Sequence, residues 1–234
     1  MKPRDAEEGV LYLVATPIGN LEDITIRALK VLRRVDLIAA EDTRRTRALL
    51  SRYRIKVPTV SFFEGNEQRR AEELVAAMKG GRDVALLCDA GTPTISDPGF
   101  RLVRRAAEEG LRVVPLPGPT ALIAALAASG LPTDTFHFFG FLPPKGAKRL
   151  RRLEEIKAMR GSVILYESPR RLTKTLEELL LHCGDRQMAL ARELTKVHEE
   201  VLRGNISELL ATLRERDLKG EITIVMEGRG WRER

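Results

Sequence analysis

The feature that most constrains the fold is the regular alternation of short apolar runs and amphipathic segments in the first half of the chain. Continuous apolar runs predict strands that are buried on both faces. Segments with apolar residues three and four positions apart predict helices, and glycine ends several of them. We expect strands at 10–15, 36–40, 59–63, 83–88 and 112–116, and helices at 24–35, 44–54, 67–78 and 98–109. This alternation is typical of a doubly wound parallel sheet, in which ligands bind beyond the carboxyl ends of the strands.

A proline-rich segment at 115–119 (PLPGP) follows these elements. Three prolines within five residues are not expected inside a helix or a strand, so the segment is expected to link two domains, at 10–116 and 119–228. In the second half we expect helices at 120–128, 147–159, 170–182 and 207–216, and strands at 136–141, 162–166, 187–192, 199–203 and 221–227. Because some of these strands follow one another directly, the second sheet is expected to be mixed. The predicted class is therefore α/β, with a mainly parallel five-stranded N-terminal sheet and a mixed C-terminal sheet.

Composition excludes several classes of protein. With 234 residues and 43% hydrophobic content, the chain is too apolar to be disordered. The longest apolar run, at 121–128, has eight residues, whereas a membrane-spanning helix needs about 20. The polar first nine residues lack the apolar stretch of a signal peptide, and the two cysteines are far apart without a CxxC motif. We therefore expect a cytoplasmic protein with no membrane association and no structural metal.

The charge of the chain is compatible with a polyanionic partner. The net charge is +7, and 30 of the 40 basic residues are arginine, whose planar fork matches phosphate geometry. Two stretches, 27–54 and 145–171, each hold nine basic residues against three acidic ones. They predict either phosphate contacts or solvated helix faces, and the sequence leaves both open. Aromatic residues make up only 5% of the chain, which argues against a base-stacking platform.

Three loops after predicted strands could carry chemistry. The loop at 15–20 is small and contains glycine, but it is neither GxGxxG nor a P-loop, so it is either a ligand turn or an ordinary connection. The loop at 88–99 is the richest, with two prolines, two glycines, two carboxylates and three hydroxyls. Part of this pattern could be only capping, because the next helix is expected to start near Asp97 or Pro98, with proline in its first turn. In the segment at 41–44, a carboxylate could hold ligand hydroxyls, or Asp42 or Thr43 could cap the helix that follows.

Taken together, these motifs resemble a known family. They lie in order at 15–21 (ATPIGNL), 40–44 (AEDTR), 89–93 (DAGTP), 117–119 (PGP), 140–143 (GFLP), 166–168 (YES), 191–196 (ARELTK) and 219–221 (KGE). The set is similar to that of the small-subunit ribosomal RNA methyltransferases in the tetrapyrrole methylase superfamily. Many members of that family continue with a further C-terminal helical segment, whereas this sequence ends soon after Trp231.

The resemblance implies a two-domain fold that holds S-adenosylmethionine in the cleft between its domains. It also implies a homodimer that methylates the ribose 2'-oxygen of a cytidine in small-subunit ribosomal RNA, free or within the assembled 30S subunit. The implied cofactor contacts are Ile18, Gly19, Gly91, Thr92, Ile95, Thr120, Ala121, Tyr166, Ala191, Gly220, Glu221 and Ile222. The residues expected to contact RNA are Arg44, Arg45, Lys148, Arg149, Arg170 and Arg171.

The expected reaction places a ribose hydroxyl in line with a sulfonium methyl group. Because a ribose hydroxyl is a poor acid, a base or a nearby cation should help it to ionise. The candidates are Lys196, Glu193, Asp42 and Lys145; a lysine needs a lowered pKa to act as the base and otherwise stabilises the developing oxyanion. Two alternatives are methylation of a tetrapyrrole precursor and a non-enzymatic RNA-binding assembly factor. The absence of a GxGPGD-like first loop and the 41–44 motif favour RNA over a tetrapyrrole.

Overall fold

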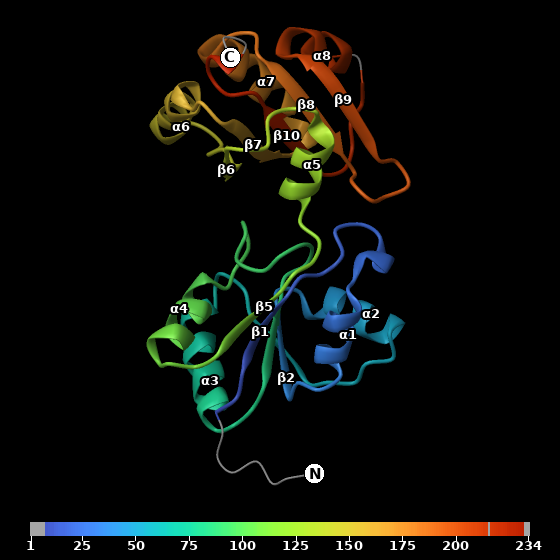
Figure 1. Cartoon of the computed structure of the whole chain (residues 1–234), viewed down its shortest axis with the longest axis vertical. Helices are drawn as coiled ribbons and strands as arrows, with labels where there is room; N and C mark the ends of the chain where they lie inside the picture. Colours follow the sequence, from blue (N-terminus) through green and yellow to red (C-terminus); the bar gives the residue numbers. More distant parts are fainter. Residues whose placement is uncertain (1–7, 215, 232–234) are drawn as a thin grey trace. The chain divides into compact units, whose positions relative to one another are not determined.

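The computed structural model describes residues 8–214 and 216–231, and residues 1–7, 215 and 232–234 lie outside the described part. The chain divides into two compact units, with the boundary between Thr120 and Ala121. Each unit contains one five-stranded sheet with helices on both faces (Figure 1). We call them unit 1 and unit 2 and describe each by itself.

The sheet of unit 1 is parallel throughout, which confirms the prediction for the first half of the chain. Its strands are β1 (Leu11–Val14), β2 (Leu37–Ala40), β3 (Thr59–Ser61), β4 (Val84–Leu87) and β5 (Val113–Leu116). They lie in the order β3-β2-β4-β1-β5. Because β4 lies between β1 and β2, the loops that leave the carboxyl ends of these three strands are neighbours.

The helices of unit 1 cover the two faces of this sheet. One face packs against α1 (Ile26–Leu32) and α2 (Thr43–Arg52), and the other against α3 (Glu67–Lys79) and α4 (Phe100–Glu108) (Figure 1). Neighbouring strand residues alternate between the faces, so that Ile38 belongs to the α1 and α2 core and Ala39 to the other. A short 3-10 helix at Leu21–Asp23 was not predicted.

Pro115 lies inside β5, as the strand predicted at 112–116 requires, and this corrects the expectation that the prolines at 115–119 all lie outside regular elements. Within the described part of the chain, β5 is at the edge of the sheet and pairs with β1 alone, where Pro115 stands opposite Leu13. Proline has no N–H to donate to a sheet ladder, and an edge strand has a side on which no donor is needed. The edge position of β5 therefore allows a proline within the strand.

Unit 2 has the mixed sheet that its consecutive strands predicted. Its strands are β6 (Phe136–Phe141), β7 (Ser162–Glu167), β8 (Gln187–Arg192), β9 (Glu200–Asn205) and β10 (Ile222–Met226), in the order β6-β7-β10-β8-β9. Only β6 and β7 are parallel; the other neighbours are antiparallel. The carboxyl ends of β7 and β8 therefore lie at the same edge of the sheet as the start of β10.

The helices of unit 2 are divided unequally between the faces of its sheet. One face packs against α5 (Ala121–Ser129), and the other against α6 (Ala147–Ala158), α7 (Pro169–Cys183) and α8 (Ile206–Leu213) (Figure 1). The last helix was predicted to reach residue 216 but ends at Leu213, and residue 215 lies outside the described part. Among the described residues, no helix is both long and apolar enough to span a bilayer.

Candidate functional site

The loops that follow β1 and β4 are joined at the carboxyl edge of the sheet in unit 1. The backbone N–H of Thr16 donates to the carbonyl of Gly91 at 2.8 Å, and the N–H of Gly91 donates to the carbonyl of Thr16 at 3.0 Å. The Thr16 hydroxyl also donates to the carbonyl of Cys88 at 3.2 Å. These bonds fix the two sequence-predicted ligand loops side by side.

Three of the expected cofactor residues of unit 1 come together at this edge. Gly91 has a φ of +89°, and a Cβ built there would lie 3.6 Å from Cγ2 of Ile18 and 3.9 Å from the carbonyl oxygen of Pro119. The hydroxyl of Thr92 donates to the same carbonyl at 3.1 Å. The space beside Gly91 is therefore bounded by the loop after β1 and by the segment after β5. Gly19 and Ile95 are exposed on the same two loops, and Thr120 follows Pro119.

Carboxylates gather where β2 and β4 end. The N–H of Asp42 donates to Asp89 Oδ1 at 3.0 Å, and the N–H of Asp89 donates to Glu41 Oε2 at 3.3 Å. Asp42 has the capping role that the sequence offered, since its Oδ1 accepts the N–H of Arg44 at 2.8 Å as the N-cap of α2. Glu41 takes no part in this cap.

The carboxylates of this edge differ in their proton affinity. Burial, together with the nearby Glu41, raises the pKa of Asp97 to about 6. Burial also raises the pKa of Glu41 and of the Cys88 thiol. In contrast, hydrogen bonds from Arg44 lower the pKa of Asp42 to about 2. Asp42 is consequently a weak base, whereas Asp97 changes its protonation state near neutral pH.

Asp97 does not cap α4, a role that the sequence left open for this loop, and another residue satisfies the helix start. Helix α4 begins at Phe100, and Glu67 Oε1 accepts the N–H groups of Gly99 at 3.0 Å and Arg101 at 3.2 Å. A glutamate 32 positions before Gly99 thus satisfies the helix start. The sequence showed Asp97 only as a carboxylate in a rich loop, and burial, which sets its pKa, depends on the folded neighbours.

In unit 2, five of the expected cofactor residues lie at one edge of the sheet. Thr223 of β10 stands opposite Tyr166 of β7 and opposite Ala191 of β8. The residues 220–222 enter β10 at this point. Ala121, another expected cofactor residue, is the first residue of α5, which packs on one face of this sheet.

Next to this edge, Lys196 is held by two carboxylates. Its Nζ lies 2.7 Å from Glu193 Oε1 and 3.2 Å from Glu221 Oε2. Glu193 Oε1 also accepts the N–H of Glu221 at 2.9 Å. A Cβ at Gly220, where φ is +95°, would lie only 2.3 Å from the Glu193 carboxylate. Glycine at 220 is therefore a condition for this arrangement.

The charges around Lys196 favour one of its two expected roles. Partial burial alone would lower the pKa of Lys196, but hydrogen bonds to Glu193 and Glu221 outweigh it and raise the pKa. Partial burial likewise favours the protonated form of Glu193, yet Lys196 and the Glu221 N–H lower the pKa of that carboxyl. Lys196 thus stays protonated at neutral pH and can stabilise negative charge, but it is not suited to accept a proton.

With this geometry established, comparison with known proteins identifies the family. Residues 10–210 match the family model described as Tetrapyrrole (Corrin/Porphyrin) Methylases. The chain belongs to this family. Three methylases named "Ribosomal RNA small subunit methyltransferase I" are among its curated relatives. That of Halalkalibacterium halodurans is 49% identical over 96% of this chain and 78% of its own length. Those of Thermotoga maritima (50% identical; 94% and 99%) and Escherichia coli O157:H7 (49% identical; 96% and 79%) are as similar.

Solved structures of other methylases share the fold. The cobalt precorrin-4 methyltransferase structure superposes with a TM-score of 0.69 at 18% identity, covering 93% of this chain and 94% of that chain. A uroporphyrin-III-C-methyltransferase from Thermus thermophilus gives a TM-score of 0.62 at 22% identity, with coverage of 93% and 94%. These likenesses confirm the tetrapyrrole-methylase fold.

The structure separates the methylase's expected RNA-contacting residues into exposed and buried ones. Arg149 is only 4% exposed, and its guanidinium donates to Glu178, to the carbonyl of Pro143 and to the Thr175 hydroxyl. Its donors are used inside unit 2, so the structure argues against a phosphate contact there. Arg44, Arg45, Lys148 and Arg170 are exposed, as is the candidate Lys145, and Arg171 is half-buried against Glu167.

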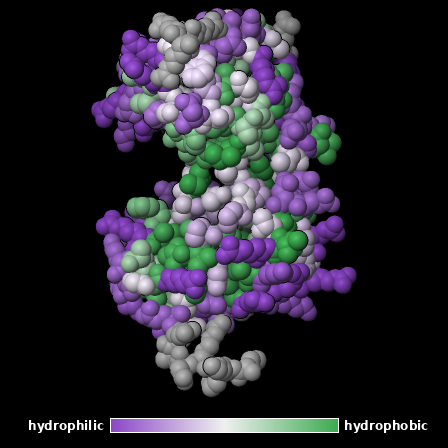
Figure 2. Space-filling model, in the orientation of Figure 1, coloured by the Kyte–Doolittle hydropathy of each residue, from purple (hydrophilic) through white to green (hydrophobic). Residues whose placement is uncertain are grey.

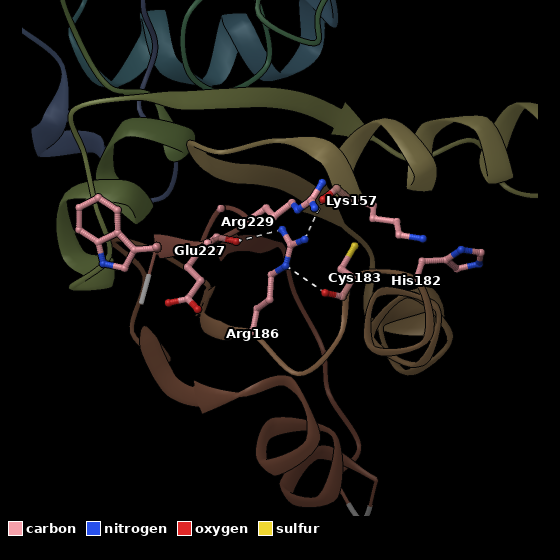
Figure 3. Close-up of a pocket in the computed structure, with 9 residues that line it drawn as sticks. Lys157, His182, Cys183, Arg186, Glu227 and Arg229 are labelled. Carbon is pink, nitrogen blue, oxygen red and sulfur yellow. Dashed lines mark hydrogen bonds between the residues drawn. The ribbon is translucent and has the colours of Figure 1, made fainter. Parts of the chain in front are cut away.

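A hollow of about 420 Å³ lies at the opposite edge of the sheet in unit 2 (Figure 3). Arg186 crosses it, and its guanidinium donates to the carbonyls of Lys157 at 2.8 Å, Cys183 at 3.0 Å and Glu227 at 3.5 Å. Arg186 thereby joins the ends of α6 and α7 to β10. This hollow contains none of the expected cofactor or catalytic residues.

Proposed function

We propose that this protein transfers a methyl group from S-adenosylmethionine to the ribose 2'-oxygen of a cytidine in small-subunit ribosomal RNA. The observation that carries the proposal is the identity of about half of all residues, over more than nine-tenths of the chain, with methylases named for the small-subunit ribosomal RNA. Tetrapyrrole-acting methylases share the fold at only 18–22% identity. We propose further that it acts in the cytoplasm as a homodimer.

The residues expected to hold S-adenosylmethionine fit such a ligand. In unit 1 they form turns of small residues and exposed backbone around Gly91, where a side chain would fill the open space beside Ile18. In unit 2 they lie at a strand edge that includes the aromatic ring of Tyr166 and the backbone of residues 220–222. Backbone groups and small side chains allow close approach of a nucleoside and an amino acid moiety. When bound, the cofactor supplies an electrophilic methyl group on a sulfonium.

The chain's own charged groups supply the electrostatics of the reaction. Lys196 stays protonated and is positioned by Glu193 and Glu221, so we assign it the stabilisation of negative charge that develops on the ribose oxygen. Asp42, with a pKa of about 2 and a capping role, is not assigned as the base. Lys145 is exposed in the loop before α6, where a phosphate contact suits it better than proton transfer.

The exposed basic residues are proposed to contact the RNA backbone. In unit 1 these are Arg44 and Arg45 on α2, and in unit 2 Lys148, Arg170 and the half-buried Arg171. Arginine forks and lysine ammonium groups on helices bind phosphate without reading sequence. Such contacts position the nucleic acid, and recognition of the base requires other groups.

The deciding experiment incubates the protein with radiolabelled S-adenosylmethionine and small subunits from cells that lack the modification. We expect label in the RNA at one ribose, in a position that resists alkaline cleavage. Free RNA and assembled subunits are compared in parallel to define the substrate. Calorimetry with S-adenosylmethionine tests the alternative of a non-enzymatic assembly factor, which predicts no cofactor binding. Incubation with a tetrapyrrole precursor tests the alternative that the protein methylates a tetrapyrrole. Cofactor binding with label in the tetrapyrrole and none in the RNA would refute the proposal.

A further inference from the structure

A hollow of about 550 Å³ lies at the carboxyl edge of unit 1, and none of the expected cofactor or catalytic residues lines it. Its walls come from three places that are far apart in the sequence: the end of β2, the segment between β3 and α3, and the segment before α4. Four carboxylates line it: Glu41, Glu64, Glu67 and Asp97. No lysine or arginine of the described part of the chain lines it, although the whole chain carries a net charge of +7.

Two exposed aromatic rings belong to the same hollow. Hydrophobic side chains reach the surface of both units (Figure 2). Phe63 is 45% exposed and Phe100 is 65% exposed, and both line the hollow. Leaving such large apolar rings in water costs free energy, and apolar surface next to placed polar groups is typical of a ligand site. The two rings therefore indicate a ligand with a flat apolar face.

The carboxylates keep unused acceptor capacity. Glu67 is only 9% exposed, and its Oε1 accepts both N–H groups at the start of α4. Among the described residues, its Oε2 accepts no hydrogen bond and lies 3.7 Å from Arg101 Nε in a long ion pair. Glu64 is exposed and has no hydrogen bond or ion pair within the described part of the chain. A ligand that donates hydrogen bonds would satisfy these oxygens.

This combination excludes most parts of an RNA chain. Phosphates would be repelled by four carboxylates, and a uracil would direct its O4 acceptor at them. A cytosine instead presents an N4 amino group, and carboxylates are its usual partners, while its ring can stack on phenylalanine. The described residues form no cluster of three metal-ligating side chains, and the aromatic rings favour a planar organic ligand over a cation.

We propose that this hollow binds the base of the target nucleotide and selects cytosine over uracil through its amino group. Phe63 and Phe100 stack on the ring, and Asp97 and Glu64 accept the two N–H groups of the amine. The inference rests on the proposed function and adds the group that reads the base. The low aromatic content of the chain is compatible with this site, because stacking on one flipped base needs only two aromatic rings and no extended base-stacking surface.

The test compares methylation of reconstituted small subunits that carry cytidine or uridine at the mapped position. The wild type is expected to prefer cytidine at least tenfold. Phe100→Ala and Phe63→Ala should lower kcat/KM on the cytidine subunit about 5- to 150-fold, since stacking of one base on an aromatic ring is worth that much. Glu64→Gln and Asp97→Asn should reduce the preference for cytidine. In every variant the affinity for S-adenosylmethionine should be unchanged.

Two variants outside the hollow serve as matched controls. Phe136→Ala removes an exposed ring from unit 2, and Glu72→Gln neutralises an exposed carboxylate on α3; both should behave as wild type. Methylation by the wild type with unaltered kcat/KM and base preference in all hollow variants would overturn this inference alone. Calorimetry that finds Mg²⁺ bound by the wild type and not by Asp97→Asn, with base preference intact, would likewise overturn it in favour of a cation. No methylation by the wild type would instead overturn the proposed function.

Discussion

Replacement of Asp97 by asparagine should stabilise the protein at neutral pH. In the folded chain, burial and the neighbouring Glu41 raise the pKa of Asp97 from an ordinary 3.8 to about 6. Because the folded state then holds the proton more tightly than the unfolded state, stability falls as pH rises from about 4 to 6 and stays reduced above that range. A pKa difference of this size between the folded and unfolded states corresponds to a loss of about 3 kcal/mol in the free energy of unfolding at neutral pH. Solvent at the rim of the loop screens it, so we expect Asp97→Asn to gain about 1–2 kcal/mol at pH 7.5.

The assay is urea denaturation followed by far-ultraviolet circular dichroism between pH 4 and pH 8. Tryptophan fluorescence is unsuitable because the only tryptophan, Trp231, is outside unit 1. The advantage of Asp97→Asn over wild type should be near zero at pH 4 and reach its full value above pH 6.5. Asp134→Asn, at an exposed position in unit 2, is the matched control and should show no such dependence. A constant difference across this range, or destabilisation at pH 7.5, would refute the reasoning.

Four further outcomes follow from the contacts described above. Gly220→Ala should destabilise unit 2 by about 1–3 kcal/mol in thermal unfolding and reduce turnover, because the new Cβ would lie 2.3 Å from Glu193. The control Gly130→Ala, which also has a positive φ but open space around it, should show only the backbone cost in thermal unfolding. Lys196→Ala should lower kcat more than tenfold and leave the affinity for the cofactor unchanged. Because Lys196 stays protonated, the ratio of wild-type to Lys196→Ala rates should be constant from pH 7 to 9, and an increase of this ratio with pH would indicate that Lys196 acts as a base. Arg149→Ala should cost about 3 kcal/mol in chemical denaturation, against almost nothing for the exposed Arg151→Ala. RNA affinity should fall steeply with salt, and Lys148→Ala or Arg170→Ala should each reduce the salt slope by about one; a flat response would contradict phosphate contacts.

The architecture was readable from the sequence because periodicity reports burial directly. Strand β4 is buried at all four positions, and its continuous apolar run predicted this. The mixed sheet of unit 2 followed from two strands in succession, now β8 and β9. Local rules were less reliable where a distant residue decides the outcome. Pro115 is tolerated because β5 is an edge strand, and the start of α4 is satisfied by Glu67 rather than by the nearby Asp97.

The sequence predicted which loops form the candidate site, but it did not predict the protonation, burial or contacts of their side chains. The sequence named Lys196 without showing that two carboxylates keep it protonated. It grouped Arg149 with the RNA-contacting residues because composition does not reveal burial, and the structure places that guanidinium against Glu178. It also gave no reason to connect Phe63 with Phe100, because only the order of the strands brings these segments to the same edge.

Backbone strain supports the assignment of function to these two edges independently of any side-chain chemistry. Five non-glycine residues in the described part of the chain have positive φ, and four of them lie in the loops in question: Thr94, Ser96, Glu193 and Thr195. Each such residue costs of order 1 kcal/mol and persists only where the surroundings enforce it. The same loops contain Asp97, a partly buried carboxyl whose pKa is raised to about 6, and Glu193, which needs a glycine beside it. Loops that serve only as connections do not require unfavourable backbone conformations or partly buried carboxylates. Their coincidence is expected when a loop is shaped to hold a ligand.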